Sequence, residues 1–260
     1  MPRLSAQQRM ALEKQDAVFL ARPIQTDPQV MAAYARQVLR LMRGRRSPSP
    51  CTDAVALVAG AFARSISALT PAAAKPVACR SGCAYCCAQS VAATPMEIFA
   101  GCPIAPAPGH HRPGGRRGGQ GAGQGPARAL DPLPPLLNDA NGCSAYAFRP
   151  LSCHAYASDD VQACIKTFVL RDKPSIRCPV SYNEVLDATR TVLVAALKVL
   201  DRASDLYELN TALAVALNTE DSETRWRDGE NIFAGLVTMR VDPGQEAWVT
   251  NFAAELAGTL

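Results

Sequence analysis

The stretch YNEVLDATRTVLVAALKVL, residues 182–200, carries the clearest structural signal in the chain. Its apolar residues recur at intervals of three and four, which places them on one face of an amphipathic helix. They are Val185, Leu186, Ala188, Val192, Leu193, Ala196, Leu197 and Leu200. The spacing predicts a long helix that buries this face in a core.

Helical spacing also occurs on both sides of this stretch. Convincing alternation with a period of two is absent, so strands are not expected and the predicted fold class is mainly α. The other expected helices cover residues 10–20, 28–43 after a cap at Thr26 or Asp27, 52–69 from Thr52 or Asp53, 95–100, 159–170 from Asp159 or Asp160, 205–217 from Asp205, and 246–256.

These helices divide the chain into three regions of one helical domain. Residues 1–70 are N-terminal helices packing on the core, residues 71–180 form an irregular cysteine-rich region, and residues 181–260 are C-terminal helices of the same domain. Within the middle region, residues 101–129 contain nine Gly and five Pro but no acidic residue. Such a composition cannot build a core, so it predicts a disordered, dispensable insert or a frameshifted stretch.

Composition narrows the function classes. With 48% hydrophobic residues the chain of 260 residues has enough apolar mass for a core. No window approaches the run of about 18 apolar residues that a spanning helix needs, and the first residues do not resemble a secretory signal. The prediction is therefore a cytoplasmic protein without a membrane partner. Scattered Arg residues with few interleaved aromatic residues do not favour nucleic acid.

The ten cysteines direct the functional argument. Cys79, Cys83, Cys86 and Cys87 fall within nine residues, and a reducing compartment excludes a disulfide framework. Either a helix or a turn at Gly82 would gather the four thiols on one side. Thiolates bind Zn²⁺ and iron strongly. The adjacent pair of thiols favours two metal ions, a cluster, or one ligand with one reserve thiol.

A second set of cysteines follows downstream. The order Cys-x3-Cys-x2-Cys-Cys over residues 79–87, then Cys-x2-Tyr-x2-Arg-Pro-x2-Cys over residues 143–153, resembles the YkgJ-type cysteine-cluster family. That family has a zinc- or iron-chelating domain, and the resemblance covers about residues 79–165, interrupted by the glycine-rich stretch. It implies six metal ligands: Cys79, Cys83, Cys86, Cys87, Cys143 and Cys153.

The resemblance leaves other residues with alternative roles. Arg149 would offset thiolate charge or form a loop salt bridge, and Pro150 would fix the turn that presents Cys153. The family usually has Arg at the position of His154, so His154 is not carried over as a ligand. Outside the matched positions, Cys164 is either a seventh thiol or a buried apolar residue. Cys51 and Cys178 fit simple burial, and Tyr146 fits packing.

The leading functional hypothesis is a metal-binding protein in which the cysteine cluster chelates zinc or iron, with an iron–sulfur cluster among the forms. Whether it is an enzyme stays open. The alternative is an iron–sulfur and S-adenosylmethionine-dependent methyltransferase. Cys79, Cys83 and Cys86 also fit the Cys-x3-Cys-x2-Cys spacing of radical S-adenosylmethionine enzymes, and the cysteine cluster is similar to that of flagellin lysine-N-methylase. A third hypothesis is an interaction module whose metal site only staples the helices. No protein partner follows from the sequence.

Overall fold

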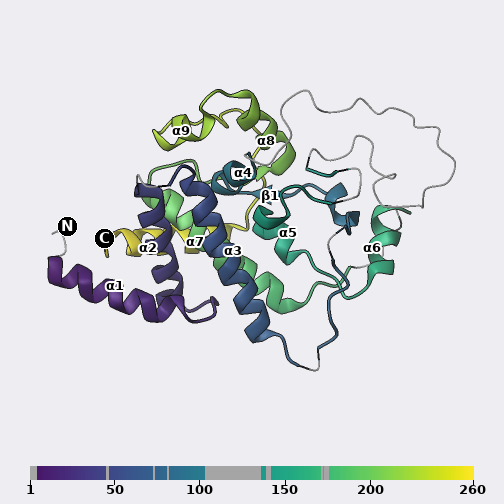
Figure 1. Ribbon diagram of the computed structural model, residues 1–260, viewed down its shortest axis with the longest axis horizontal. Helices are drawn as coiled ribbons and strands as arrows, with labels where there is room; N and C mark the ends of the chain where they lie inside the picture. Colours follow the sequence, from purple (N-terminus) through teal and green to yellow (C-terminus); the bar gives the residue numbers. More distant parts are fainter. Residues whose placement is uncertain are drawn as a thin grey trace.

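The computed structural model describes residues 5–44, 47–72, 74–80, 82–102, 136–138, 142–170, 172 and 176–260. These residues are mainly α-helical, which confirms the predicted fold class (Figure 1). The helices are α1 (Ala6–Leu20), α2 (Pro28–Arg43), α3 (Pro50–Leu69), α4 (Pro95–Gly101), α5 (Leu151–Ala155), α6 (Val161–Phe168), α7 (Val180–Val199), α8 (Leu209–Asn218), α9 (Ser222–Arg227) and α10 (Pro243–Ala257), with 3₁₀ turns η1 (Tyr85–Ala88) and η4 (Tyr146–Phe148).

Helix α7 lies at the centre of the core. It packs against α2, α3, α5 and α10, so N-terminal and C-terminal helices bury the same apolar surface. The predicted apolar face of α7 is buried except at Leu186 and Leu200, which are half-buried. Helix α4 is also buried along its length and packs between α3 and α8. The cysteine-rich segments are built on this helical core.

Helix α3 is the most apolar of the long helices. By length and composition it is the one described helix that would be able to cross a membrane. In the structure it packs against α2, α4, α5 and α7, with Cys51, Val55, Val58 and Phe62 buried in the core.

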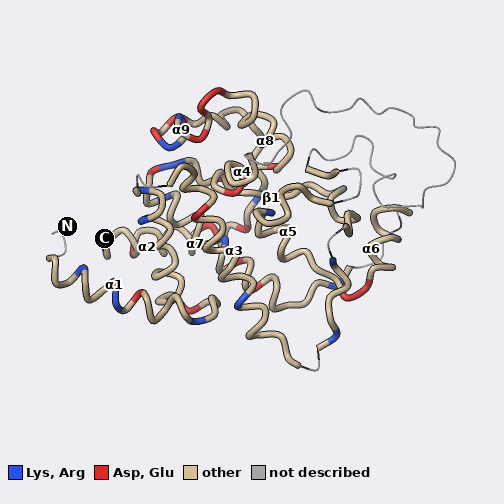
Figure 2. Tube along the Cα trace, viewed as in Figure 1, with Lys and Arg blue, Asp and Glu red and all other residues tan. Residues whose placement is uncertain are grey.

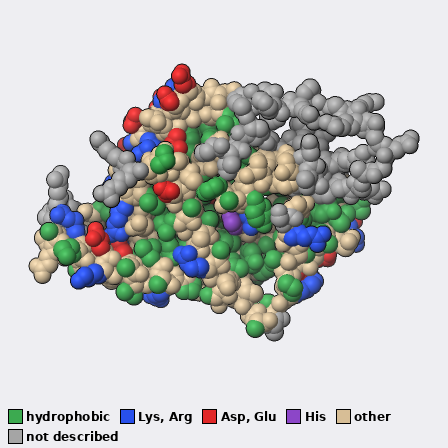
Figure 3. All heavy atoms as spheres, in the orientation of Figure 1, with side chains coloured by type: hydrophobic (Ala, Val, Ile, Leu, Met, Phe, Trp, Pro, Cys, Tyr) green, Lys and Arg blue, Asp and Glu red, His purple; other side chains and the backbone are tan. Residues whose placement is uncertain are grey.

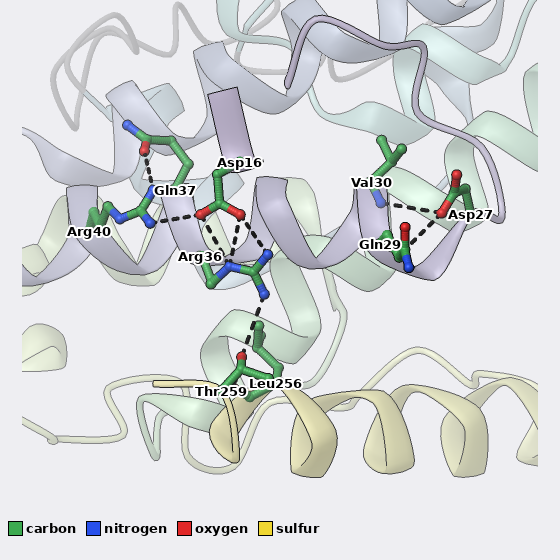
Figure 4. Close-up of polar contacts among 9 residues, drawn as sticks. All are labelled: Asp16, Asp27, Gln29, Val30, Arg36, Gln37, Arg40, Leu256 and Thr259. Carbon is green, nitrogen blue, oxygen red and sulfur yellow. Dashed lines mark hydrogen bonds and ion pairs between the residues drawn. The ribbon is translucent and has the colours of Figure 1, made fainter. Parts of the chain in front are cut away.

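Helix α1 is attached to α2 through a buried ion pair (Figure 4). The Asp16 carboxylate is 1% exposed and accepts hydrogen bonds from Arg36 Nη2 at 2.6 Å and from Arg40 Nη2 at 2.7 Å. Arg36 Nη1 also reaches Thr259 Oγ1 at 3.5 Å, beyond the end of α10. The network therefore joins both ends of the chain to α2.

Several predicted helix limits were wrong. Helix α3 begins at Pro50 after Ser49, because proline is well suited to the first helical turn. The last predicted cap, Asp205, precedes a short strand, and Glu208 caps α8 instead through its bond from the Thr211 amide.

That strand belongs to a small antiparallel sheet. Strand β1 (Ala92–Ala93) pairs with β2 (Tyr207–Glu208), with Ala92 opposite Glu208 and Ala93 opposite Tyr207. Two residues are too few for alternation to be visible in the sequence, which is why no strand was expected. The sheet brings the segment after the first cysteines against the start of α8.

The basic and acidic residues do not separate into two surfaces in the view of Figure 2, where both signs occur on α1 and around α9. Apolar side chains gather over α3 and α5 on the face shown in Figure 3. Of the predicted insert 101–129, Gly101 and Cys102 lie at the end of α4. Its other residues lie outside the described part of the chain.

Candidate functional site

The first cysteine segment turns at Gly82 and does not form one continuous helix. Gly82 has a φ of 82°, a left-handed conformation that glycine adopts without steric cost. The Cys83 amide donates to the Arg80 carbonyl at 3.0 Å, and η1 follows with Cys86 and Cys87. Of the two arrangements left open by the sequence, the structure has the tight turn.

The second cysteine segment is held by a bridge and a short helix. Cys143 forms an isolated antiparallel bridge with Leu137, and the Ser144 amide donates to the Leu136 carbonyl at 2.8 Å. Pro150 directly precedes α5, and its carbonyl accepts the Cys153 amide at 2.8 Å. Cys153 is therefore presented by the first turn of α5.

Both segments line one cavity of about 300 Å³. Its other walls are mostly apolar and come from residues near β1, α5, α7 and α8, with Tyr146, Arg149, Asn183 and Asn210 as polar or aromatic groups. Five of the six cysteines that the sequence singled out line the cavity. These five, called the pocket thiols below, are Cys83, Cys86, Cys87, Cys143 and Cys153.

Glu97 anchors the start of α5 to α4. Its side chain is buried, with Oε1 accepting the Leu151 amide at 2.7 Å and Oε2 accepting the Thr94 amide at 2.7 Å. The reciprocal bond from the Glu97 amide to Thr94 Oγ1 completes a capping box. Sequence reasoning missed Glu97, although Thr94-Pro95-Met96-Glu97 has the spacing of that motif.

Ser152 is a second anchor that sequence reasoning missed. Its hydroxyl donates to the Ala92 carbonyl in β1 at 2.5 Å and accepts a bond from Arg190 Nη2 of α7 at 2.8 Å. Cys153 thus follows a residue that is tied to both the sheet and the central helix. The signal for this role lies in the fold, because the partners of Ser152 are 38 and 60 residues away.

The adjacent thiols Cys86 and Cys87 are chemically unequal. A hydrogen bond from the Cys86 thiol to the Cys87 sulfur, together with burial, raises the pKa of Cys86 well above its ordinary value. The same hydrogen bond lowers the pKa of Cys87, because it stabilises the thiolate that accepts it. Among the pocket thiols, Cys87 is thus the one most readily deprotonated.

The other pocket thiols are protonated when no metal is bound. Burial raises the pKa of Cys83 and Cys143 and takes that of Cys153 to about 12. Amide groups act in the opposite direction on two of them, since the Tyr85 N–H donates to the Cys83 sulfur and the Ala145 N–H to the Cys143 sulfur. Amide donors of this kind stabilise thiolate ligands.

Arg149 supplies the positive charge beside the thiols. Its guanidinium opposes the effect of burial on the pKa of Cys143 and Cys153, and it lies 4.4 Å from the centroid of the Tyr146 ring. Its Nε is buried and has no hydrogen-bond partner among the described residues.

His154 points into a different environment. Its ring centroid lies 5.7 Å from that of Phe62, and it is not among the residues that line the cavity. Burial, followed by the charge of Arg149, lowers the pKa of His154 to about 4. The imidazole is therefore neutral at pH 7.

All ten cysteines lie within the described residues, and each is a free thiol. Cys79, the sixth predicted ligand, does not line the cavity and instead accepts the Ser158 amide at 3.4 Å. Cys51 is buried in α3 beside Glu223, as expected for a packing role. Cys178 is only half-buried, so simple burial does not describe it.

Among the described residues, no three His, Cys, Asp or Glu side chains are already close enough together to hold a metal ion. The pocket thiols line a common cavity but do not surround a single point within it. Comparison of the chain with family models, with curated proteins and with solved structures found no match.

Proposed function

We propose that the protein binds zinc or iron through the pocket thiols, which makes it a metal-binding protein of a reducing, cytoplasmic compartment. The observation that carries the proposal is the meeting of two cysteine segments, separated by more than fifty residues of sequence, around one cavity. Free thiols otherwise behave as small apolar groups dispersed through a core. Five of them lining one cavity are a donor set for a thiophilic metal.

The local hydrogen bonds support the same proposal. Burial raises the pKa of Cys83 and Cys143, and the backbone amide of the residue two positions later opposes this effect on each, so the backbone would help to stabilise their thiolates once a metal binds. Arg149 offsets part of the negative charge that several thiolates would bring together. Binding requires the side chains to rotate until the sulfurs lie about 2.3 Å from a zinc ion.

The volume of the cavity bears on whether the pocket thiols would hold one zinc ion, two ions or an iron–sulfur cluster. A volume of about 300 Å³ is much larger than the share of one water molecule, which is about 30 Å³. Four pocket thiols would complete a tetrahedral zinc site or ligate an iron–sulfur cluster, leaving a fifth thiol in reserve. A second ion or a cluster uses the space better than one zinc ion does.

The first experiment measures metal per chain after purification without oxygen, with an absorbance spectrum that separates coloured iron–sulfur clusters from colourless zinc. Cys86→Ser and Cys87→Ser should each lower the metal content, because both thiols line the cavity. Cys102→Ser is the matched control: Cys102 donates only to the Ile98 carbonyl, a bond that serine keeps. Full metal content in both variants of the pair would contradict the proposal.

The alternative function, that of an enzyme, is supported by the apolar residues that line the cavity. Leu186, Leu209 and Met239 also line it, and 300 Å³ lies at the lower end of the range for small-molecule sites. A cluster on the pocket thiols would leave this part open to an organic molecule such as S-adenosylmethionine. Equilibrium binding of S-adenosylmethionine to the protein with iron and sulfide restored tests the alternative, and absence of binding contradicts it.

A further inference from the structure

Arg149 is the one charged side chain among the described residues that line the cavity of the pocket thiols. No described Asp or Glu lines it, and its other polar side chains are amides, hydroxyls and thiols. Most of the remaining lining is apolar. Because arginine stays protonated in proteins, the cavity combines an apolar lining with a single fixed positive charge.

That charge has no acidic partner in the described part of the chain. Arg149 belongs to none of the ion pairs found there, and its buried Nε–H has no acceptor among the same residues. Two other half-buried arginines are engaged: Arg190 donates to Ser152 Oγ at 2.8 Å, and Arg202 donates to the Arg227 carbonyl at 2.6 Å. A buried donor without an acceptor and a charge without a counter-charge both cost free energy, and an anion bound to Arg149 would remove both costs.

Tyr146 is the partner against which the guanidinium packs. Arg149 Cζ lies 4.4 Å from the centroid of the Tyr146 ring. A guanidinium over an aromatic ring still binds a carboxylate through two N–H groups, because these lie at its edge. Tyr146 also lines the cavity and is 42% exposed, which places this part of the wall at the molecular surface. The pair therefore suits a planar anion that enters from solvent.

The apolar lining suits the body of an organic molecule. Val91, Leu136, Leu186, Leu209 and Met239 all line the cavity, whose volume of about 300 Å³ fits a small ligand. Each methylene group that is buried there should strengthen binding about fourfold. A neutral apolar molecule would leave Arg149 unpaired, and an inorganic anion would leave the apolar lining in contact with water. The cavity therefore matches a molecule that has both an anionic group and an apolar chain.

We propose that the cavity binds a small organic carboxylate, whose anionic group pairs with Arg149 and whose apolar chain contacts the leucines and methionine of the lining. The inference goes beyond the proposed function and does not rest on metal binding. Thiolates on a bound metal ion would share Arg149 with the carboxylate, so binding is measured on the reduced, metal-free protein. Circular dichroism confirms that this protein and each variant are folded.

Calorimetric titration with octanoate tests the proposal, with octanamide as the neutral molecule of nearly the same shape. The wild-type protein should bind octanoate at least tenfold more tightly than octanamide. Arg149→Met should weaken octanoate binding about tenfold to a hundredfold, because hydrogen bonds to a charged group are lost, and should leave octanamide binding unchanged. Arg177→Met is the matched control, since Arg177 is exposed and does not line the cavity, and it should retain wild-type affinity for both.

The length of the carboxylate chain tests the contribution of the apolar lining. From butanoate through hexanoate to octanoate, affinity for the wild-type protein should rise about fourfold with each added methylene group until the cavity is filled. Equal affinity for butanoate and octanoate would show that the charge binds without the apolar lining, and would overturn the proposal. Absence of octanoate binding, or equal binding of octanoate and octanamide, would also overturn it.

A measurement on the wild-type protein locates the ligand without any substitution. Octanoate in the cavity should slow alkylation of Cys143 and Cys153, which line it, and should leave alkylation of Cys102 unchanged, because Cys102 lies outside the cavity lining. Unchanged alkylation of both cavity thiols at saturating octanoate would place the ligand elsewhere and overturn the proposal. Metal per chain in the protein as purified, which tests the proposed function, is measured separately, so failure of either proposal leaves the other standing.

Discussion

At the scale of single residues, the pair Cys86 and Cys87 shows how two identical side chains become different. One thiol donates to the other, so the pKa of the donor rises and that of the acceptor falls. The sequence reveals the adjacency but not the direction of this bond. A metal ion approaching the cavity would meet Cys87 as the first available thiolate.

Cys87 should therefore be the pocket thiol that reacts fastest with iodoacetamide in the metal-free protein at pH 7, since the thiolate is the nucleophile. As the pH is increased, the alkylation rate of Cys87 should begin to rise at a lower pH than the rates of Cys83, Cys86, Cys143 and Cys153. Cys86→Ala removes the donor and should slow Cys87, whereas Cys86→Ser keeps a donor. Peptide mass spectrometry after timed alkylation measures this, and equal rates at all five thiols would contradict it.

Arg149 is the second residue whose charge matters. Because its guanidinium opposes the rise in pKa of Cys143 and Cys153 that burial causes, Arg149→Met should raise the pKa of both thiols further. Protons then compete more strongly with the metal, so zinc affinity should fall about tenfold and the loss should grow as pH decreases. Arg149→Lys should recover part of the affinity. Competition with a chelator at several pH values measures it; pH-independent affinity in Arg149→Met would contradict the charge effect.

At the scale of elements, Glu97 connects two short helices that would be marginal alone. It accepts one amide from its own capping box and one from the start of α5, which carries Cys153. Glutamine has one acceptor oxygen, so Glu97→Gln leaves one of these buried amides unpaired. The expected cost is about 1–3 kcal/mol of unfolding free energy, with weaker zinc binding because Cys153 shifts.

Thr94→Ala is the control for Glu97. It removes the capping hydroxyl but keeps the bond between Glu97 and Leu151, so it should cost about 1 kcal/mol without a change in zinc affinity. Urea unfolding and zinc competition are measured on both variants. Equal effects of the two substitutions on zinc affinity would show that α4, and not its contact with α5, positions the thiol.

The sequence predicted the long helices but missed the shortest helices and the strands. Long helices such as α2 and α7 repeat their apolar spacing over several turns, so their existence followed from periodicity alone. Helices α5 and α9, together with the strands, are too short for a period and form through contacts such as Ser152 with Arg190. The cysteine spacing indicated the pocket thiols, but only the chain path could separate Cys79 from them.

At the scale of the whole molecule, the ion-paired helix α1 and the helices beside the pocket thiols lie toward opposite ends. Figure 1 shows α1 and the C-terminus at one end and α5 and α6 toward the other. The ion pair of Asp16 with Arg36 and Arg40 stabilises the first end, and Arg36 is only 7% exposed. The pocket thiols depend instead on contacts of α4 with α3 and α8 and of α5 with α3 and α7. A change in the ion pair should therefore leave the thiols in place.

Asp16→Asn tests this separation, because it leaves the buried guanidinium of Arg36 without its counter-charge. Breaking a buried ion pair on one side typically costs about 3–5 kcal/mol, so urea unfolding should show a loss of that order. Zinc per chain and zinc affinity of the folded protein should equal those of the wild type. Asp27→Asn changes a neighbouring carboxylate that accepts amides at the start of α2 and should cost far less. If Asp16→Asn reduced zinc affinity as strongly as stability, the two ends of the molecule would have to be energetically coupled through α2 and α7, the helices that connect them.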